Sequence, residues 1–265
     1  MGKKRNIIVG QSGGPTSVIN SSLAGVYKTA KERGFHKVYG MLHGIEGLLD
    51  EMYVDLSTQI HSDMDIELLK RTPSAFLGSC RYKLPDIHEN PAFYEKIFAI
   101  LDKLDIEVFI YIGGNDSMDT VSKLSRYAEK ISSDIRVIGI PKTIDNDLVE
   151  TDHTPGFGSA AKYVASTVRE IAIDASVYDN KKSVTIVEIM GRHAGWLTAA
   201  SALARKFEHD NPVLIYLPET DFDQDAFIEK VRTSLETTPN LVVCISEGIH
   251  DNTSTFICEY SNDVG

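Results

Sequence analysis

Cysteine and cationic side chains are scarce in this sequence of 265 residues. The cysteines, Cys80, Cys244 and Cys258, form no CxxC pair, which argues against structural zinc and favours thiols in a reducing compartment. With a net charge of −11, the chain lacks the basic surface that a general nucleic-acid binder needs. Long apolar runs are missing, as is a secretory apolar segment after Met1–Asn6. We therefore expect a cytoplasmic protein with neither nucleic-acid nor membrane partners.

Short Val/Ile-rich segments do recur along the chain, separated by helical patterns. Uninterrupted apolar segments predict strands covered on both faces, and their alternation with helices predicts an α/β fold with doubly wound, mostly parallel sheets. The expected strands are Asn6–Val9, Lys37–Met41, Val108–Ile112, Arg136–Ile140, Ser183–Ile189, Val213–Tyr216 and Leu241–Ile245. The clearest helix is Ser159–Val177, with Ser159 as its N-cap. The less regular stretch Leu48–Asn90 is expected to form hairpins or a lid.

Two glycine turns follow expected strands. Gly13-Gly14 precedes Pro15, which suits an early helical position, and backbone N–H groups at a helix start favour an anion. A tight strand-to-helix turn also favours glycine, so this pattern alone does not separate the two interpretations. Gly113-Gly114 repeats the arrangement and is followed by Asn115-Asp116-Ser117, whose oxygens suit a phosphate and metal site. The alternative is that Asn115 and Asp116 cap the helix.

The run Pro141–Asp147 brings a lysine, a hydroxyl and two carboxylates together. In an extended backbone Thr143, Asp145 and Asp147 share one side, because alternate residues lie on the same face. One carboxylate would then accept a proton while the other holds Mg²⁺ against phosphates, and Lys142 would offset charge in phosphoryl transfer. The alternative is an Asx-rich turn whose side chains bond their own backbone.

Cations also stand beside two further glycines. Arg192, in Met190-Gly191-Arg192, is suited to grip a phosphate bidentately, although a surface salt bridge is the alternative, as is a capped or core role for His193. Arg81 and Lys83 follow Gly78, where a phosphate contact and a solvated loop both fit. Glu247, after the last expected strand, is suited to accept hydrogen bonds from sugar hydroxyls.

Together these segments resemble the 6-phosphofructokinase family, in order through nearly the whole chain. The matching segments are Ser12–Gly14, Phe76–Ser79, Gly113–Ser117, Pro141–Asp147, Met190–Arg192 and Glu247. The resemblance implies two Rossmann-like lobes, with residues 1–140 binding the phosphoryl donor and Mg²⁺ and residues 141–265 binding the sugar phosphate. Nothing here matches the sugar-phosphate ligands that follow Glu247 in the family. The second lobe is therefore expected to be incomplete and the chain truncated at its C-terminus.

The resemblance also implies a role for each matching side chain. Asp145 would accept the proton of the sugar 1-hydroxyl, with Lys142 and Asp116 as further catalytic groups. The sugar phosphate would contact Thr143, Ile144, Asp145, Met190, Gly191, Arg192 and Glu247. The donor would contact Gly13, Gly14, Arg81 and Ser117. Mg²⁺, the expected cofactor, would be held by Asn115, where most relatives have aspartate, and by Asp147.

Two positions bear on the identity of the donor. ATP-dependent relatives have glycine where this chain has Asp116 and Lys142. A carboxylate at 116 fills and charges the space of an ATP α-phosphate, and Lys142 can hold a pyrophosphate that has no nucleoside to anchor it. The chain thus resembles the pyrophosphate-dependent branch, which implies reversible transfer from pyrophosphate to fructose 6-phosphate.

Three alternatives to this interpretation stay open. The first is an ATP-dependent kinase, and the second is a truncated, catalytically weak fragment that binds phosphates. The third, an NAD- or lipid-kinase relationship, fits the turn at Gly113 but not Thr143–Asp147. The resemblance further implies a homodimer or homotetramer, with Lys182 near the position from which relatives lend a cation to a neighbouring sugar site.

Overall fold

The computed structural model of the chain describes residues 5–177, 181–207 and 209–260 and divides into two compact units, Met1–Thr143 and Ile144–Gly265. The sequence-based boundary between the two lobes falls after residue 140. The C-terminal end, Ser261–Gly265, lies outside the described residues. Among the helices of the described ranges, none is long and apolar enough to cross a membrane.

The first unit is built on a five-stranded sheet with the order β3-β2-β1-β4-β5. Its strands are β1 (Asn6–Gln11), β2 (Val38–Met41), β3 (Tyr53–Asp55), β4 (Ile106–Gly113) and β5 (Arg136–Pro141). The strand β3 pairs antiparallel with β2, and every other pairing in this sheet is parallel. This arrangement confirms the expected mostly parallel α/β sheet, and β3 is a short strand that the sequence did not indicate.

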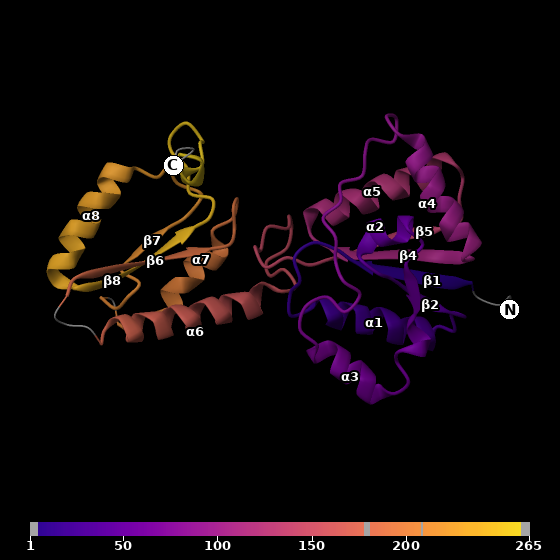
Figure 1. Cartoon of the computed structure of the whole chain (residues 1–265), viewed down its shortest axis with the longest axis horizontal. Helices are drawn as coiled ribbons and strands as arrows, with labels where there is room; N and C mark the ends of the chain where they lie inside the picture. Colours follow the sequence, from indigo (N-terminus) through magenta and orange to yellow (C-terminus); the bar gives the residue numbers. More distant parts are fainter. Residues whose placement is uncertain (1–4, 178–180, 208, 261–265) are drawn as a thin grey trace. The chain divides into compact units, whose positions relative to one another are not determined.

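Helices cover both faces of this sheet (Figure 1). One face carries α1 (Ile19–Glu32) and α3 (Asp63–Arg71), and the other carries α2 (Gly44–Leu49), α4 (Pro91–Lys103) and α5 (Asn115–Lys130). Successive residues of a strand point to opposite faces, so Ile7 belongs to the core beneath α1 and Ile8 to the core beneath α4. Both faces are therefore buried, as the uninterrupted apolar strands predicted.

Three local expectations differ from the structure. The stretch Leu48–Asn90 contains α3, which begins after Ser62 with a capping box to Asp65, so the prediction of hairpins or a lid alone is wrong. The helix after the first glycine turn begins at Ile19, so Pro15 lies in the preceding turn. The N-cap of α6 is Gly156, not Ser159, because the chain turns at a glycine with φ of 115°.

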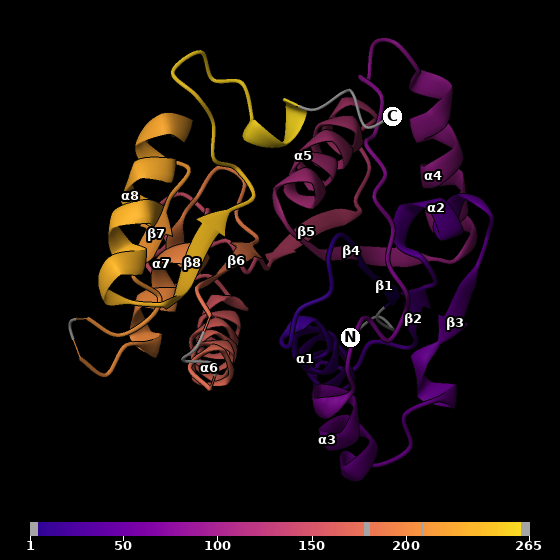
Figure 2. The same ribbon diagram turned by 60° about the vertical axis from the view of Figure 1, so that its left-hand side comes forward.

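The second unit holds a parallel three-stranded sheet with the order β6-β8-β7 (Figure 2). Its strands are β6 (Ser183–Ile189), β7 (Leu214–Tyr216) and β8 (Asn240–Ser246). Its α-helices are α6 (Phe157–Ala175), α7 (Trp196–Ala200) and α8 (Gln224–Thr237). Short 3-10 turns lie at Leu56–Thr58 in the first unit and at Ser201–Ala204 and Ile257–Glu259 in the second. The core of the second unit gathers Val168 of α6, Ile189, Leu197 and Cys244, so α6 and α7 pack on one face of the sheet.

Candidate functional site

The sheet of the first unit has a topological switch at β1. Its neighbours are β2 on one side and β4 on the other, and the helices that follow, α1 and α5, cover opposite faces. Ligands of open parallel sheets bind at the carboxyl ends of strands beside such a switch. The strands β1, β4 and β5 all end at this edge of the sheet, and the turns that follow them carry predicted donor residues.

The turn after β1 is held by the loop before α4. Gly13 has a left-handed φ of 75°, which a residue with a side chain adopts only with strain. Its N–H donates to the carbonyl of Cys80 at 3.0 Å, and the hydroxyl of Ser79 donates to its carbonyl at 2.5 Å. Burial raises the pKa of Tyr111, whose protonated hydroxyl lies 3.4 Å from the Cys80 Sγ below this loop.

The turn after β4 is tied to the first turn by side chains. The buried hydroxyl of Ser117 donates to the hydroxyl of Ser12 at 3.0 Å. The N-cap of α5 is Gly114, so the alternative of Asn115 and Asp116 as caps is wrong, and both lie exposed in the first turn of the helix. A carboxylate there is favoured by the positive end of the helix dipole.

Asp116 also pairs with a cation of the neighbouring loop. The Nζ of Lys83 lies 3.5 Å from its Oδ1, and the side chains are 79% and 75% exposed. An ion pair this open to solvent contributes little to stability. The carboxylate of Asp116 therefore remains accessible to a ligand at this edge.

Lys142 is the buried cation of this edge. Its side chain is only 4% exposed, and its Nζ donates to the carbonyl of Gly14 at 2.6 Å. Its backbone N–H donates to the carbonyl of Gly113 at 2.9 Å, so one residue contacts both glycine turns. Water is largely excluded around this ammonium, which strengthens its attraction for an anion.

The run that follows Lys142 is not extended. The strand β5 ends at Pro141, and Asn146 adopts a left-handed conformation with φ of 58°. The prediction that alternate residues share a face is therefore wrong for this run. The division between the units falls after Thr143, so Thr143 belongs to the first unit and Ile144, half-buried Asp145 and exposed Asp147 belong to the second.

In the second unit the turns after β6 and β8 interlock. The N–H of Gly191 donates to the Oε1 of Glu247 at 3.1 Å, and the hydroxyl of Ser246 donates to the carbonyl of Gly191 at 2.7 Å. Gly191 has φ of 124°, a conformation that favours glycine. The structure thus brings together Gly191 and Glu247, which the sequence separates by more than fifty residues.

Exposed side chains surround this pair of turns. Met190 is 53% exposed, and the Arg192 guanidinium lies 5.7 Å from the ring centre of Phe256. Within the described part of the chain, no acidic side chain forms an ion pair with Arg192, which argues against the salt-bridge alternative. His193 is exposed, and its ring centre lies 6.0 Å from that of Phe256 with the two rings tilted by 53°, so a core histidine is also wrong.

Sequence reasoning assigned no supporting role to several residues that hold the turns in place. They are Ser12, Ser79, Cys80, Asn146, Ser246 and Phe256. Ser79, Cys80 and Ser246 act through hydrogen bonds to distant backbone, for which the sequence carries no periodic signal. Arg81 follows Cys80 and is exposed, so it is close along the chain to the contact with Gly13.

Oxygen ligands for a metal are available in both units. No cluster of three or more His, Cys, Asp or Glu side chains occurs within residues 5–177, 181–207 and 209–260. Mg²⁺ is commonly held by one or two carboxylates together with waters and substrate phosphates, so such a cluster is not required. Asn115 and Asp116, exposed in the first turn of α5, and Asp147 supply amide and carboxylate oxygens of the suitable type.

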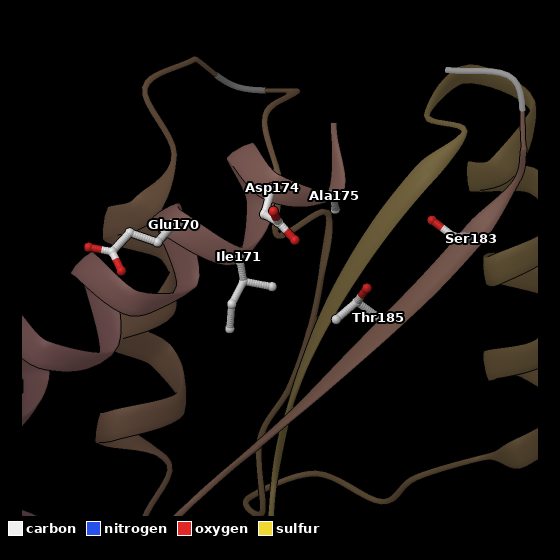
Figure 3. A pocket seen from close by; sticks show the side chains of 6 residues that line it. All are labelled: Glu170, Ile171, Asp174, Ala175, Ser183 and Thr185. Atoms are coloured by element: carbon white, nitrogen blue, oxygen red, sulfur yellow. The ribbon is translucent and has the colours of Figure 1, made fainter. Parts of the chain in front are cut away.

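A surface hollow of about 450 Å³ lies away from these turns, between the end of α6 and the start of β6 (Figure 3). Its lining residues are Glu170, Ile171, Asp174, Ala175, Ser183 and Thr185. The carboxylates of Glu170 and Asp174 give it negative charge, which disfavours a phosphate ligand. No predicted site residue lines this hollow.

Comparison with known proteins agrees with the resemblance noted in the sequence. The phosphofructokinase family model matches residues 6–264. A pyrophosphate–fructose 6-phosphate 1-phosphotransferase of Rhodospirillum rubrum is 47% identical over 249 residues, which are 94% of this chain and 59% of the relative. An ATP-dependent 6-phosphofructokinase of Aliivibrio salmonicida is 33% identical over 84% of this chain and 63% of the relative.

Solved structures share the fold. A crystal structure of a pyrophosphate-dependent phosphofructokinase from Marinobacter aquaeolei matches with a TM-score of 0.83 and 41% identity. The match covers 93% of this chain and 61% of that one. The chain therefore spans about three fifths of the length of these pyrophosphate-dependent relatives.

Proposed function

Because the chain belongs to the phosphofructokinase family, we propose that it transfers a phosphoryl group from pyrophosphate to the 1-hydroxyl of fructose 6-phosphate. The observation that carries this proposal is the buried ammonium of Lys142 against the carbonyl of Gly14. A fixed cation between two glycine turns suits a small, highly charged donor. Pyrophosphate has no nucleoside, so charge contacts of this kind must supply its binding energy.

The identity of the donor is supported by two side chains and one comparison. Lys142 and Asp116 are the catalytic and selective groups on the donor side, with Gly13, Gly14, Ser117 and Arg81 as further donor contacts. The carboxylate of Asp116 disfavours the additional phosphate of ATP by repulsion. The relative whose name states pyrophosphate dependence is 47% identical, against 33% for the one whose name states ATP dependence.

Asp145 is the proposed general base. A carboxylate accepts the proton of the 1-hydroxyl as its oxygen attacks phosphorus, and it returns the proton in the reverse direction. Transfer from pyrophosphate is therefore proposed to be reversible. The proposed sugar-phosphate contacts are Thr143, Ile144, Asp145, Met190, Gly191, Arg192 and Glu247.

Mg²⁺ is the proposed cofactor, with Asn115 and Asp147 as ligands and Asp116 beside them. When bound, it neutralises charge on the phosphate oxygens during transfer. Asn115 contributes an amide oxygen without charge, so the carboxylates of Asp116 and Asp147 supply the negative charge of the set.

The wider assignments follow from the same proposal. Residues 1–140 are assigned to the donor and Mg²⁺, and residues 141–265 to the sugar phosphate. A homodimer or homotetramer remains proposed, with the exposed Lys182 as the residue lent to a neighbour. The three cysteines are free thiols, which supports a reducing compartment such as the cytoplasm.

A second candidate is a phosphate-binding fragment with weak catalysis. It is favoured by the length of the chain, which covers 59% of the Rhodospirillum rubrum relative. Such a polypeptide would bind pyrophosphate through the first unit and turn over slowly or not at all.

One assay separates these candidates. The chain, and the chain extended with the C-terminal continuation of the Rhodospirillum rubrum relative, are each incubated with Mg²⁺, fructose 6-phosphate and either pyrophosphate or ATP. Phosphorus NMR follows the sugar bisphosphate. We expect faster transfer from pyrophosphate. If only the extended chain transfers the phosphoryl group, the fragment candidate is supported. Equal or faster transfer from ATP would overturn the donor assignment. No transfer by either chain would overturn the proposed reaction.

A further inference from the structure

Asp145 and Asp147 flank Asn146, a residue that is buried in the protein. Asn146 is only 8% exposed. Its Nδ2 donates to the carbonyl of Asp152 at 3.1 Å, and its Oδ1 accepts the N–H of Thr154 at 2.8 Å. Both partners belong to the loop that leads into α6, so the side chain ties two separate stretches of backbone together.

The backbone of Asn146 is left-handed, with φ of 58°. Asparagine adopts this region more readily than other residues with a side chain, apart from aspartate. The conformation interrupts an extended backbone path between Asp145 and Asp147. It therefore sets the directions in which the two flanking carboxylates leave the backbone.

Thr154, to which the Asn146 side chain is hydrogen-bonded, is itself attached to the start of α6. Thr154 is 3% exposed, and its carbonyl accepts the N–H of Phe157, the first residue of α6. The helix α6 packs into the core of the second unit through Val168. Asn146 is thus connected through Thr154 to a helix start that cannot shift without disturbing that core.

We propose that Asn146 is a positioning residue, which fixes the carboxylates of Asp145 and Asp147 for phosphoryl transfer. This inference rests on the proposed function. Asn146 itself is assigned no contact with substrate or metal, because both polar groups of its side chain bond to backbone. Its effect on the reaction arises from geometry, since a misplaced catalytic group costs rate even when binding is unchanged.

The test compares Asn146→Gly with Glu150→Gly. Glycine at 146 keeps the left-handed backbone accessible but removes both tether hydrogen bonds. Glu150 lies on the same loop, is exposed and also has a positive φ of 53°, so Glu150→Gly controls for added backbone freedom. Because glycine is compatible with the native φ at both positions, both variants are expected to fold.

Two measurements are made on each variant in whichever form of the chain the donor assay shows to be active. We expect Asn146→Gly to lower kcat about tenfold or more while leaving the KM for pyrophosphate within about twofold. Amide exchange at Thr154 should accelerate by at least about tenfold without a change in global unfolding. Glu150→Gly should leave kcat and the exchange at Thr154 within about twofold of the wild type.

The outcomes distinguish this inference from the function on which it rests. An unchanged kcat in Asn146→Gly, or unchanged exchange at Thr154, would overturn the positioning role while the wild-type reaction stands. An equal loss of kcat in Glu150→Gly would also overturn it, since loop flexibility rather than the tether would then be responsible. Absence of any transfer by the wild type would overturn the proposed function as well.

Discussion

The Nζ of Lys142 lies 2.6 Å from the carbonyl oxygen of Gly14, a residue 128 positions earlier in the chain. This contact orients the ammonium across the first glycine turn while its backbone N–H holds the second turn through Gly113. A buried charge is costly to desolvate, and its electrostatic interactions are strengthened where water is excluded. A bound anion is therefore attracted to this ammonium, which makes the pair Lys142–Gly14 the centre of the donor predictions.

Replacing both Lys142 and Asp116 by glycine should narrow the preference for pyrophosphate over ATP. The double variant loses the cation proposed to bind pyrophosphate and the carboxylate proposed to repel a nucleotide phosphate. We expect kcat/KM for pyrophosphate to fall by at least about a hundredfold, as for the loss of a buried charged contact. Parallel assays with the two donors measure the ratio of kcat/KM for pyrophosphate to kcat/KM for ATP. The control is Lys130→Ala, an exposed site in the last turn of α5. An undiminished ratio would contradict the donor assignment.

Asp145→Asn should lower turnover by at least about a hundredfold, because an amide cannot accept the hydroxyl proton. Binding of pyrophosphate, measured by calorimetry, should be spared, since the proposed donor residues lie in the first unit. Asp174→Asn, in α6 and outside the proposed site, serves as the matched control. A mild loss of turnover would reject Asp145 as the base.

Gly13→Ala and Gly34→Ala form a matched pair. The two glycines have φ of 75° and 78°, so each substitution should lower the free energy of unfolding by about 1–2 kcal/mol through backbone strain. A Cβ at Gly13 would lie 3.2 Å from the Nζ of Lys142, whereas at Gly34 it would meet nothing within 4 Å. Only Gly13→Ala should therefore weaken pyrophosphate binding.

Urea unfolding and pyrophosphate titration of the two glycine variants check this prediction. Equal binding by both variants, with equal loss of stability, would show that the first turn does not contact the donor. Weaker binding by Gly34→Ala would show instead that strain alone impairs the site.

His250 should make the stability of the fold depend on pH. Its hydrogen bond to the carbonyl of Asp251, aided by that to Pro218 and by the carboxylates of Asp221 and Asp251, raises the pKa of His250. A raised folded-state pKa means that the stabilisation is fully present below the unfolded value of about 6.5 and is lost as pH rises through the higher folded value. The interactions of protonated His250 therefore stabilise the folded state more at low pH than at high pH.

Urea unfolding of the wild type and of His250→Gln at pH 6 and pH 9 tests the expected direction of the change in the free energy of unfolding. The wild type should lose more stability than the variant over this interval. The same loss in both proteins, or a gain in the wild type, would contradict the role of His250.

The main strands were predictable because their apolar runs are uninterrupted. Ser183–Ile189 was predicted with the bounds that the structure has, and β1, β4 and β8 differ by a few residues at their ends. The helix α3 was missed, because only Ile66 and Leu69 of its nine residues are buried and its start depends on the capping box between Ser62 and Asp65. The wrong cap at Ser159 has a related cause, since a glycine at positive φ begins α6 without a side-chain cap.

By itself, the sequence determined the alternation of strands and helices and the residue types at the ends of β1, β4, β5, β6 and β8. These features depend on local periodicity and composition, which a single chain displays directly. Only the tertiary structure decided that Lys142 contacts Gly14, that Gly191 contacts Glu247, and that Asn146 turns left-handed toward Thr154. The first two contacts join residues far apart in the sequence, which meet only after the sheets have set the register of their strands. The third depends on the path of the loop before α6, which no periodic pattern in the sequence indicates.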